Sequence, residues 1–151
     1  MKCKVYQFYK LANILYHWNV PVLPRLIYYF MRFFFATSIP YAATIGRDTY
    51  FNNSGLGIVI HRRVVIGENC VIGHGVTIGG RSGHEKVPVI GSNVTVGVGS
   101  IILGPIKVGD HAIVGANAVV IDDVPPHAVV AGVPARIIKY ADSSSILSKT
   151  A

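Results

Sequence analysis

Residues 64–79 read VVIGENCVIGHGVTIG, and within this stretch a large aliphatic side chain recurs every six residues. The same marker continues along the chain at Ile60, Ile66, Ile72, Ile78, Ile90, Val96, Ile102, Val108, Val114 and Val120. Plain strands alternate with a period of two and helices with a period of about 3.6, so neither explains a step of six. The repeat therefore predicts short strands joined by tight turns, with the markers stacked inward from coil to coil.

The repeat is interrupted once, between Ile78 and Ile90. The missing marker would fall on His84, and residues 80–87 (GRSGHEKV) show no hexapeptide pattern. Because the twelve-residue step keeps the register, we expect a loop that is pushed out of one coil. An irregular coil is the alternative. Loops held on a rigid scaffold often carry function.

The composition limits the class of protein. A chain of 151 residues with 51% apolar and 14% charged residues suits one globular domain and excludes disorder. The two cysteines, Cys3 and Cys70, lie in unrelated sequence settings, which favours a reducing, cytoplasmic compartment. The net charge of +7 comes from scattered basic residues, so nucleic acid is not an expected partner.

Residues 1–40 differ from the rest of the chain in two ways: they contain no Asp or Glu, and they contain most of the aromatic residues. A first amphipathic helix is predicted from apolar residues at helical spacing: Val5, Phe8, Leu11, Ala12, Leu15 and Trp18. Prolines in residues 19–24 (NVPVLP) end it, and residues 25–35 (RLIYYFMRFFF) predict a second helix.

The chain is thus expected to comprise a helical leader (1–40), a β-rich body (41–140) and a flexible tail (141–151). The leader is too interrupted by proline and arginine for the ~20 apolar residues that a membrane span needs. Two interpretations of its aromatic residues remain open. They pack on the body or on a neighbouring subunit, or they lie at the inner face of the membrane with Lys and Arg at the headgroups.

Three segments resemble the hexapeptide-repeat acyltransferases: residues 66–71 (IGENCV), 74–80 (HGVTIGG) and 124–136 (VPPHAVVAGVPAR). The resemblance covers residues 42–139 and is strongest to serine acetyltransferases and to the sugar O-acetyltransferases of capsule, colanic acid and O-antigen synthesis. It implies a mainly β fold, a left-handed parallel β-helix behind the short helical leader. It also implies a homotrimer with acetyl-CoA, the co-substrate, in the groove between neighbouring β-helices.

Acetyl transfer to a hydroxyl needs a base, and histidine is the usual one. Three of the six histidines are expected at the solvated surface: His17, His111 and His127. The candidates for the base are His74, His61 and His84. His74 is preferred because it should face outward, just before Gly79 and Gly80. For each candidate the alternative is a turn histidine bonded to a backbone carbonyl.

Serine acetyltransferases carry their base three residues before the glycine of a Gly-Ile-Val segment. That segment is residues 57–59 here, so the matching position is Ser54. Their second active-site histidine, which precedes a proline in the loop, matches Val87. These departures and the short aromatic leader favour the sugar-modifying branch.

The phosphates of CoA call for basic side chains, and the resemblance assigns this role to Arg136 and Lys139. Small residues would leave room for the pantetheine arm: Gly79, Gly80, Gly97 and Ala116. No metal is expected. The γ-class carbonic anhydrases share the fold, but if His74 matched their second zinc ligand, the first would be Asn69, a poor ligand for zinc.

The expected function is therefore acetyl-CoA-dependent O-acetylation of a sugar hydroxyl in surface-polysaccharide biosynthesis, by direct transfer. The acceptor would be a sugar, a nucleotide sugar or a lipid-linked sugar. One alternative is serine O-acetylation for cysteine biosynthesis, and a more distant one is a non-catalytic trimeric scaffold.

Overall fold

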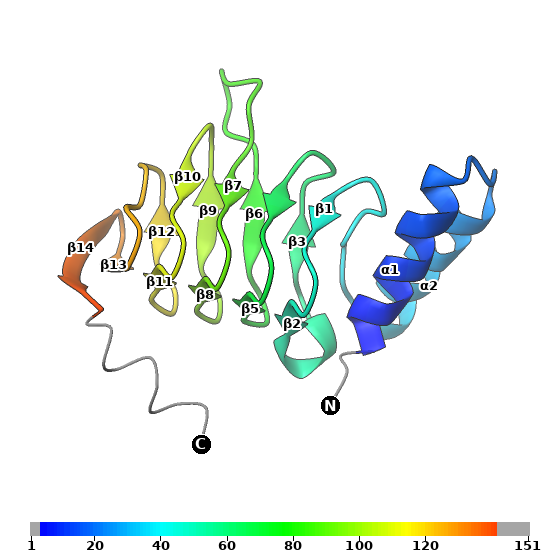
Figure 1. Ribbon diagram of the computed structural model, residues 1–151, viewed down its shortest axis with the longest axis horizontal. Coiled ribbons are helices and arrows are strands. Elements are labelled where there is room, and N and C mark those ends of the chain that lie inside the picture. Colours follow the sequence, from blue (N-terminus) through cyan, green and yellow to red (C-terminus); the bar gives the residue numbers. More distant parts are fainter. Residues whose placement is uncertain (1–3, 142–151) are drawn as a thin grey trace.

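The computed structural model describes residues 4–141, which form two helices followed by a parallel β-helix (Figure 1). This confirms the fold class expected from the six-residue repeat. The expected flexible tail lies outside the described residues, apart from Ala141.

Each coil of the β-helix contributes one short strand to each of three sheets. The first sheet contains β1 (Thr44–Ile45), β4 (Val65–Ile66), β7 (Val89–Ile90) and β10 (Lys107–Val108). The second contains β2 (Tyr50–Phe51), β5 (Val71–Ile72), β8 (Thr95–Val96), β11 (Ile113–Val114), β13 (Ala128–Gly132) and β14 (Ala135–Tyr140). The third contains β3 (Val59–Ile60), β6 (Thr77–Gly79), β9 (Ile101–Leu103) and β12 (Val119–Val120). All pairs are parallel except β13 with β14, where the chain turns back on itself.

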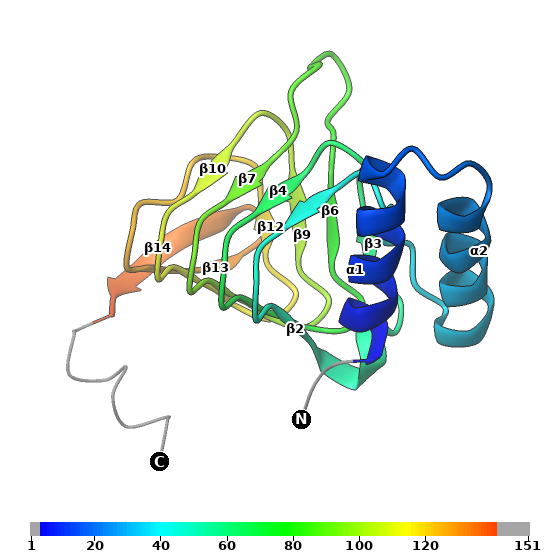
Figure 2. The same cartoon turned by 45° about the vertical axis from the view of Figure 1, so that its right-hand side comes forward.

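We name the turns by the sheets that they join, in chain order. The first corner leads from the first sheet to the second, the second corner from the second to the third, and the third corner from the third back to the first. Figure 2 shows the coils stacked along one axis, with the helices packed at the N-terminal end.

The ten aliphatic markers are all buried, and they form the centre of the core. In the third sheet, for example, Ile60 is in register with Ile78, and Ile78 with Ile102. Glycine follows several markers for a steric reason. At Gly73, for example, a Cβ would lie 2.6 Å from the backbone nitrogen of Val98 in the next coil. The hydrophobic effect and coil spacing together account for the repeat.

The predicted loop is confirmed. Between β6 and β7 the chain leaves the coil and projects from the third corner (Figure 1), and residues 81–86 are exposed. The strands on either side keep their register, since Val65 pairs with Val89.

The two helices are α1 (Lys4–His17) and α2 (Leu23–Phe35). Their existence matches the prediction, and Val5 and Ala12 are buried as expected, but other residues of the predicted apolar face are not. Leu11 and Trp18 are 49% and 74% exposed, whereas Tyr9 is buried. The hydroxyl of Tyr9 donates to the carbonyl of Ala43 (2.6 Å) and accepts the N–H of Ile45 (3.1 Å), so it caps backbone groups of the first coil. Among residues 4–141, neither helix is long and apolar enough to cross a membrane.

Burial raises the pKa of Tyr9 to about 12. An ordinary tyrosine has a pKa of about 10, so the folded state favours the neutral phenol. Its contribution to stability is complete below about pH 10 and is lost as the pH rises towards 12.

We predict that Tyr9→Phe lowers the free energy of unfolding at neutral pH by about 1–3 kcal/mol, because two buried backbone groups lose their partner. The variant should also lose less stability than the wild type between pH 8 and pH 11. Urea unfolding at both pH values measures this, with the exposed Tyr16→Phe as the matched control. An unchanged pH dependence in Tyr9→Phe would contradict the assignment.

Candidate active site

His74 lies at the second corner, where the backbone holds it on both sides. Its carbonyl accepts the N–H of Gly99 (2.9 Å), and the N–H of Gly75 donates to the carbonyl of Leu56 (2.8 Å). The imidazole is half-buried, and its Nδ1 lies 3.0 Å from the side-chain amide of Asn53. The predicted outward position of His74 therefore has a specific neighbour, contributed by the preceding coil.

Asn53 belongs to a short turn, residues 52–55, that bulges from the second corner. Its successive residues Asn53, Ser54 and Gly55 have φ values of 48°, 53° and 73°. Left-handed conformations are uncommon for residues other than glycine and often mark functional sites. The turn is held against α1, since a Cβ at Gly55 would lie 3.4 Å from Val5 Cγ1. Ser54, at the family's base position, thus lies in the turn that contacts His74.

The contact between Asn53 and His74 sets the proton on the ring. An amide presents either its oxygen or its nitrogen to a neighbour after a rotation of 180°. With the oxygen facing Nδ1–H, the neutral ring keeps a lone pair on Nε2 and can accept a proton there. The structure places the amide nitrogen against Nδ1, and in this orientation the Nε2 atom of the neutral ring carries the proton and is a donor instead.

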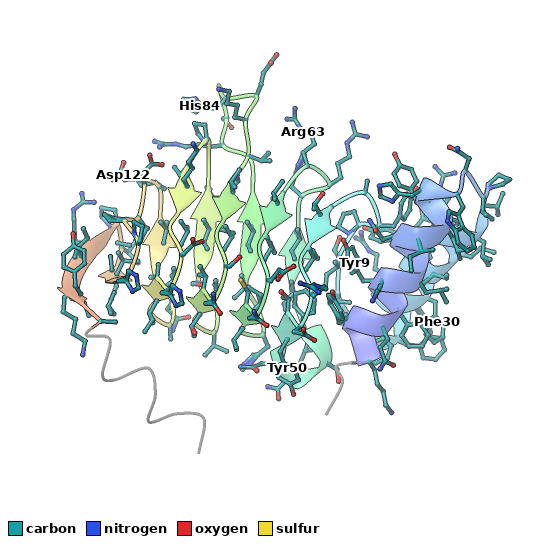
Figure 3. The ribbon with its side chains drawn as sticks, in the orientation of Figure 1. Tyr9, Phe30, Tyr50, Arg63, His84 and Asp122 are labelled. Atoms are coloured by element: carbon teal, nitrogen blue, oxygen red, sulfur yellow. The ribbon has the colours of Figure 1, made fainter. Side chains whose placement is uncertain are left out.

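His61 and His84 lie at the third corner, so one protomer does not bring them together with His74. The Nδ1 atom of His61 accepts the N–H of Arg63 (3.2 Å), which leaves the proton of the neutral ring on Nε2. His84 is exposed on the projecting loop. The guanidinium of Arg63 donates to the carbonyl of Glu85 and ties this loop to the corner. Figure 3 shows Arg63 and His84 along the same edge of the β-helix.

The small residues proposed for the pantetheine arm fall into two groups. Beside Gly79 and Gly80 the space is open, because an added Cβ would meet its nearest neighbour only at 4.0 Å. At Gly97 an added Cβ would lie 2.5 Å from the backbone nitrogen of Ala116, so coil stacking alone requires glycine there. Gly97 and Ala116 lie at the second corner, whereas Gly79 and Gly80 lead into the third.

The proposed phosphate contacts lie near the C-terminal end of the β-helix. Arg136 forms an ion pair with Asp122 (3.3 Å) in which both side chains are about two-thirds exposed. A pair this exposed contributes little to stability, so Arg136 can exchange it for another anion. Lys139 is exposed on the same strand, β14.

Cys70 is buried at the first corner, with its thiol 3.2 Å from the carbonyl of Gly91. Burial raises the pKa of this thiol, and a neutral, enclosed thiol is a poor nucleophile. Within residues 4–141 no cluster of three His, Cys, Asp or Glu side chains is arranged to hold a metal ion.

Asn53 is the site residue that the sequence analysis missed. The available signal was the segment Asn-Asn-Ser-Gly at residues 52–55, because asparagine and glycine are the residues that most readily adopt left-handed conformations.

Residues 88–122 match the bacterial transferase hexapeptide (six repeats), and residues 63–83 match the hexapeptide repeat of succinyl-transferase. The serine acetyltransferase of Synechococcus elongatus is 35% identical over 132 residues, which cover 86% of this chain and 54% of the relative. The chain is a hexapeptide-repeat protein related to the serine acetyltransferases.

Solved structures agree with this relationship. A soybean serine acetyltransferase complexed with serine has a TM-score of 0.82 and 38% identity, covering 89% of this chain and 56% of that one. A serine acetyltransferase in complex with CoA has a TM-score of 0.81 and 36% identity, covering 89% and 55%. The chain therefore spans little more than half the length of these relatives.

The expectation of sugar O-acetylation in polysaccharide biosynthesis is wrong, because relatives at 35–40% identity are named serine acetyltransferase. That expectation relied on the leader as a distinguishing feature. The alignment covers 86% of the chain, more than the β-helix alone, so it includes part of the leader. The leader is thus shared with serine acetyltransferases and does not indicate a sugar acceptor.

We predict that Arg63→Ala loosens the projecting loop and increases tryptic cleavage after Arg81 several-fold, because the side chain that ties Glu85 to the corner is lost. Arg62→Ala is the matched control, as Arg62 is an exposed neighbour in the same turn. Mass spectrometry of timed digests measures the cleavage. Equal rates in both variants would contradict the role of Arg63.

Proposed function

We propose that this chain catalyses O-acetylation of L-serine by acetyl-CoA and acts as a homotrimer. The observation that carries the proposal is the 35–40% identity to serine acetyltransferases over 85–86% of the chain. Two related serine acetyltransferase structures, one in complex with serine and one in complex with CoA, support this pair of substrates.

His74 is the general base in this proposal. The position that matches the family's base is occupied by Ser54, whose hydroxyl has no tendency to accept a proton near neutral pH. His74 lies in the next coil and contacts the same turn through Asn53, at 3.0 Å. The imidazole therefore replaces the missing base at the same corner of the β-helix.

The reaction is a direct transfer. The serine hydroxyl oxygen attacks the thioester carbonyl carbon while Nε2 of His74 accepts the hydroxyl proton. The C–S bond then breaks, and the proton passes from His74 to the departing sulfur, which gives O-acetylserine and free CoA. When the Asn53 amide is rotated by 180°, its oxygen accepts the hydrogen bond from Nδ1–H and stabilises the imidazolium that forms in between.

Assembly completes the site. The second corner of one protomer holds His74, whereas the open space beside Gly79 and Gly80 lies towards the third corner. We place acetyl-CoA between the second corner of one protomer and the third corner of its neighbour, with Arg136 and Lys139 near the CoA phosphates. His84, on the projecting loop, would then approach from the neighbour.

We predict that the protein releases CoA from acetyl-CoA when L-serine is present, and that His74→Ala lowers kcat/KM by about 10²–10⁴-fold through loss of general base catalysis. His17→Ala, at an exposed histidine at the end of α1, is the matched control and should retain most of the rate. A thiol-release assay measures turnover, and size-exclusion chromatography with light scattering checks the trimer. No release with serine would contradict the function, and a near-normal rate in His74→Ala would contradict the base.

The Asn53 contact yields a separate prediction. In Asn53→Asp a carboxylate replaces the amide beside His74 and favours the protonated imidazole, so the acidic limb of the kcat/KM profile should move to higher pH. Asn52→Asp, which adds the same charge one residue away, should shift the limb less. Equal shifts in both variants would show that Asn53 has no special contact with the base.

A further inference from the structure

The outer face of α2 is apolar over its whole length. Successive residues of a helix are about 100° apart, and six exposed side chains of α2 fall within an arc of about 140° on this basis. These six residues form what we call the outer face: Leu23, Leu26, Tyr29, Phe30, Phe33 and Phe34. Phe33 and Phe34 are 84% and 66% exposed. A helix on the surface of a soluble protein normally shows polar residues in this direction.

The orientation of α2 is set by packing. Phe8 of α1 contacts Phe30 and Phe35, with ring centroids 5.3 and 6.0 Å apart, while Met31 is fully buried. The hydroxyl of Tyr28 lies 2.9 Å from Ser38 Oγ at the entry to the first coil. The outer face therefore points away from the rest of the protomer, except at Phe30, whose ring also contacts Phe8.

Positive charge flanks the outer face. Arg25 and Arg32 are seven residues apart, exposed, and just beyond the edge that Tyr29 marks. No Asp or Glu precedes Asp48 in the sequence. The helical pair therefore carries cations without any compensating carboxylate of its own.

We propose that the outer face of α2 docks on an anionic lipid bilayer. An apolar, aromatic face with arginines at its border is the pattern of a helix that lies in the membrane interface. Aromatic side chains favour this depth, and Trp18, 74% exposed at the end of α1, adds another. With 13 residues α2 is too short to span the bilayer, so it would lie on the surface.

A second copy of the chain fits the outer face less well. A two-fold contact through α2 would bring Arg25 and Arg32 towards the same residues of the other copy. Residues 4–47 contain no Asp or Glu whose carboxylate could offset this repulsion. An anionic surface supplies the missing negative charge.

Co-sedimentation of the full chain with vesicles tests the proposal, which is independent of the proposed acetylation. The wild type should bind vesicles of phosphatidylcholine with phosphatidylglycerol, but not phosphatidylcholine alone, and high salt should weaken binding. Replacing Arg25 and Arg32 by Gln should lower the partition coefficient roughly fivefold per charge. Phe33→Ser with Phe34→Ser should lower it at least about tenfold, because apolar area no longer enters the interface. Ile138→Ser, an exposed apolar site on β14, is the matched control.

Three outcomes would overturn the proposal: no binding of the wild type to anionic vesicles at low salt, equal binding by the Phe33/Phe34 variant, or a wild-type mass in solution that this variant halves. The last result would assign the face to a second copy. Serine-dependent CoA release should be unchanged in the helix variants, so the two proposals fail separately.

Discussion

Each coil of the β-helix must bring its backbone within hydrogen-bonding distance of the coils on either side, a spacing of about 4.8 Å. This spacing leaves no room for a Cβ at Gly73 or Gly97, which would lie 2.6 and 2.5 Å from the backbone of the next coil. It also requires inward side chains of similar size in every coil, which the isoleucines and valines provide. Variation is confined to the corners, where the chain can leave the coil without breaking the ladder. Of the two unusual corners, residues 52–55 contact His74, and residues 80–87 project from the third corner.

The stacking of the coils could be predicted from the sequence because a large aliphatic side chain that points inward recurs every six residues. The projecting loop could also be predicted, since the step of twelve residues from Ile78 to Ile90 is a whole number of repeats and preserves the register of the flanking strands. The burial of Tyr9 in α1 could not be predicted from the sequence. A pattern of apolar residues favours Leu11 over Tyr9, but the Tyr9 hydroxyl satisfies two buried backbone groups. Hydrogen bonds of this kind depend on where the helix docks, which periodicity does not encode.

The candidate site was predictable only in part. His74 could be proposed from its outward register, but its partner Asn53 is 21 residues away and reaches the ring through a left-handed turn. The leader and the absence of histidine at Ser54 both favour a sugar acceptor when the sequence is considered alone, and this expectation is wrong. The similarity to serine acetyltransferases extends into the leader, so the departure at Ser54 does not by itself indicate another acceptor. A base contributed by the next coil reconciles this difference with the shared fold.

In the proposed reaction serine is acetylated beside His74, at the second corner. A crystal structure of the protein with CoA and L-serine bound would test this arrangement. We expect the serine hydroxyl within hydrogen-bonding distance of His74 Nε2, with the CoA thiol close by and Asn53 on the opposite ring nitrogen. Serine bound away from His74, with its hydroxyl facing another histidine or no base, would contradict it.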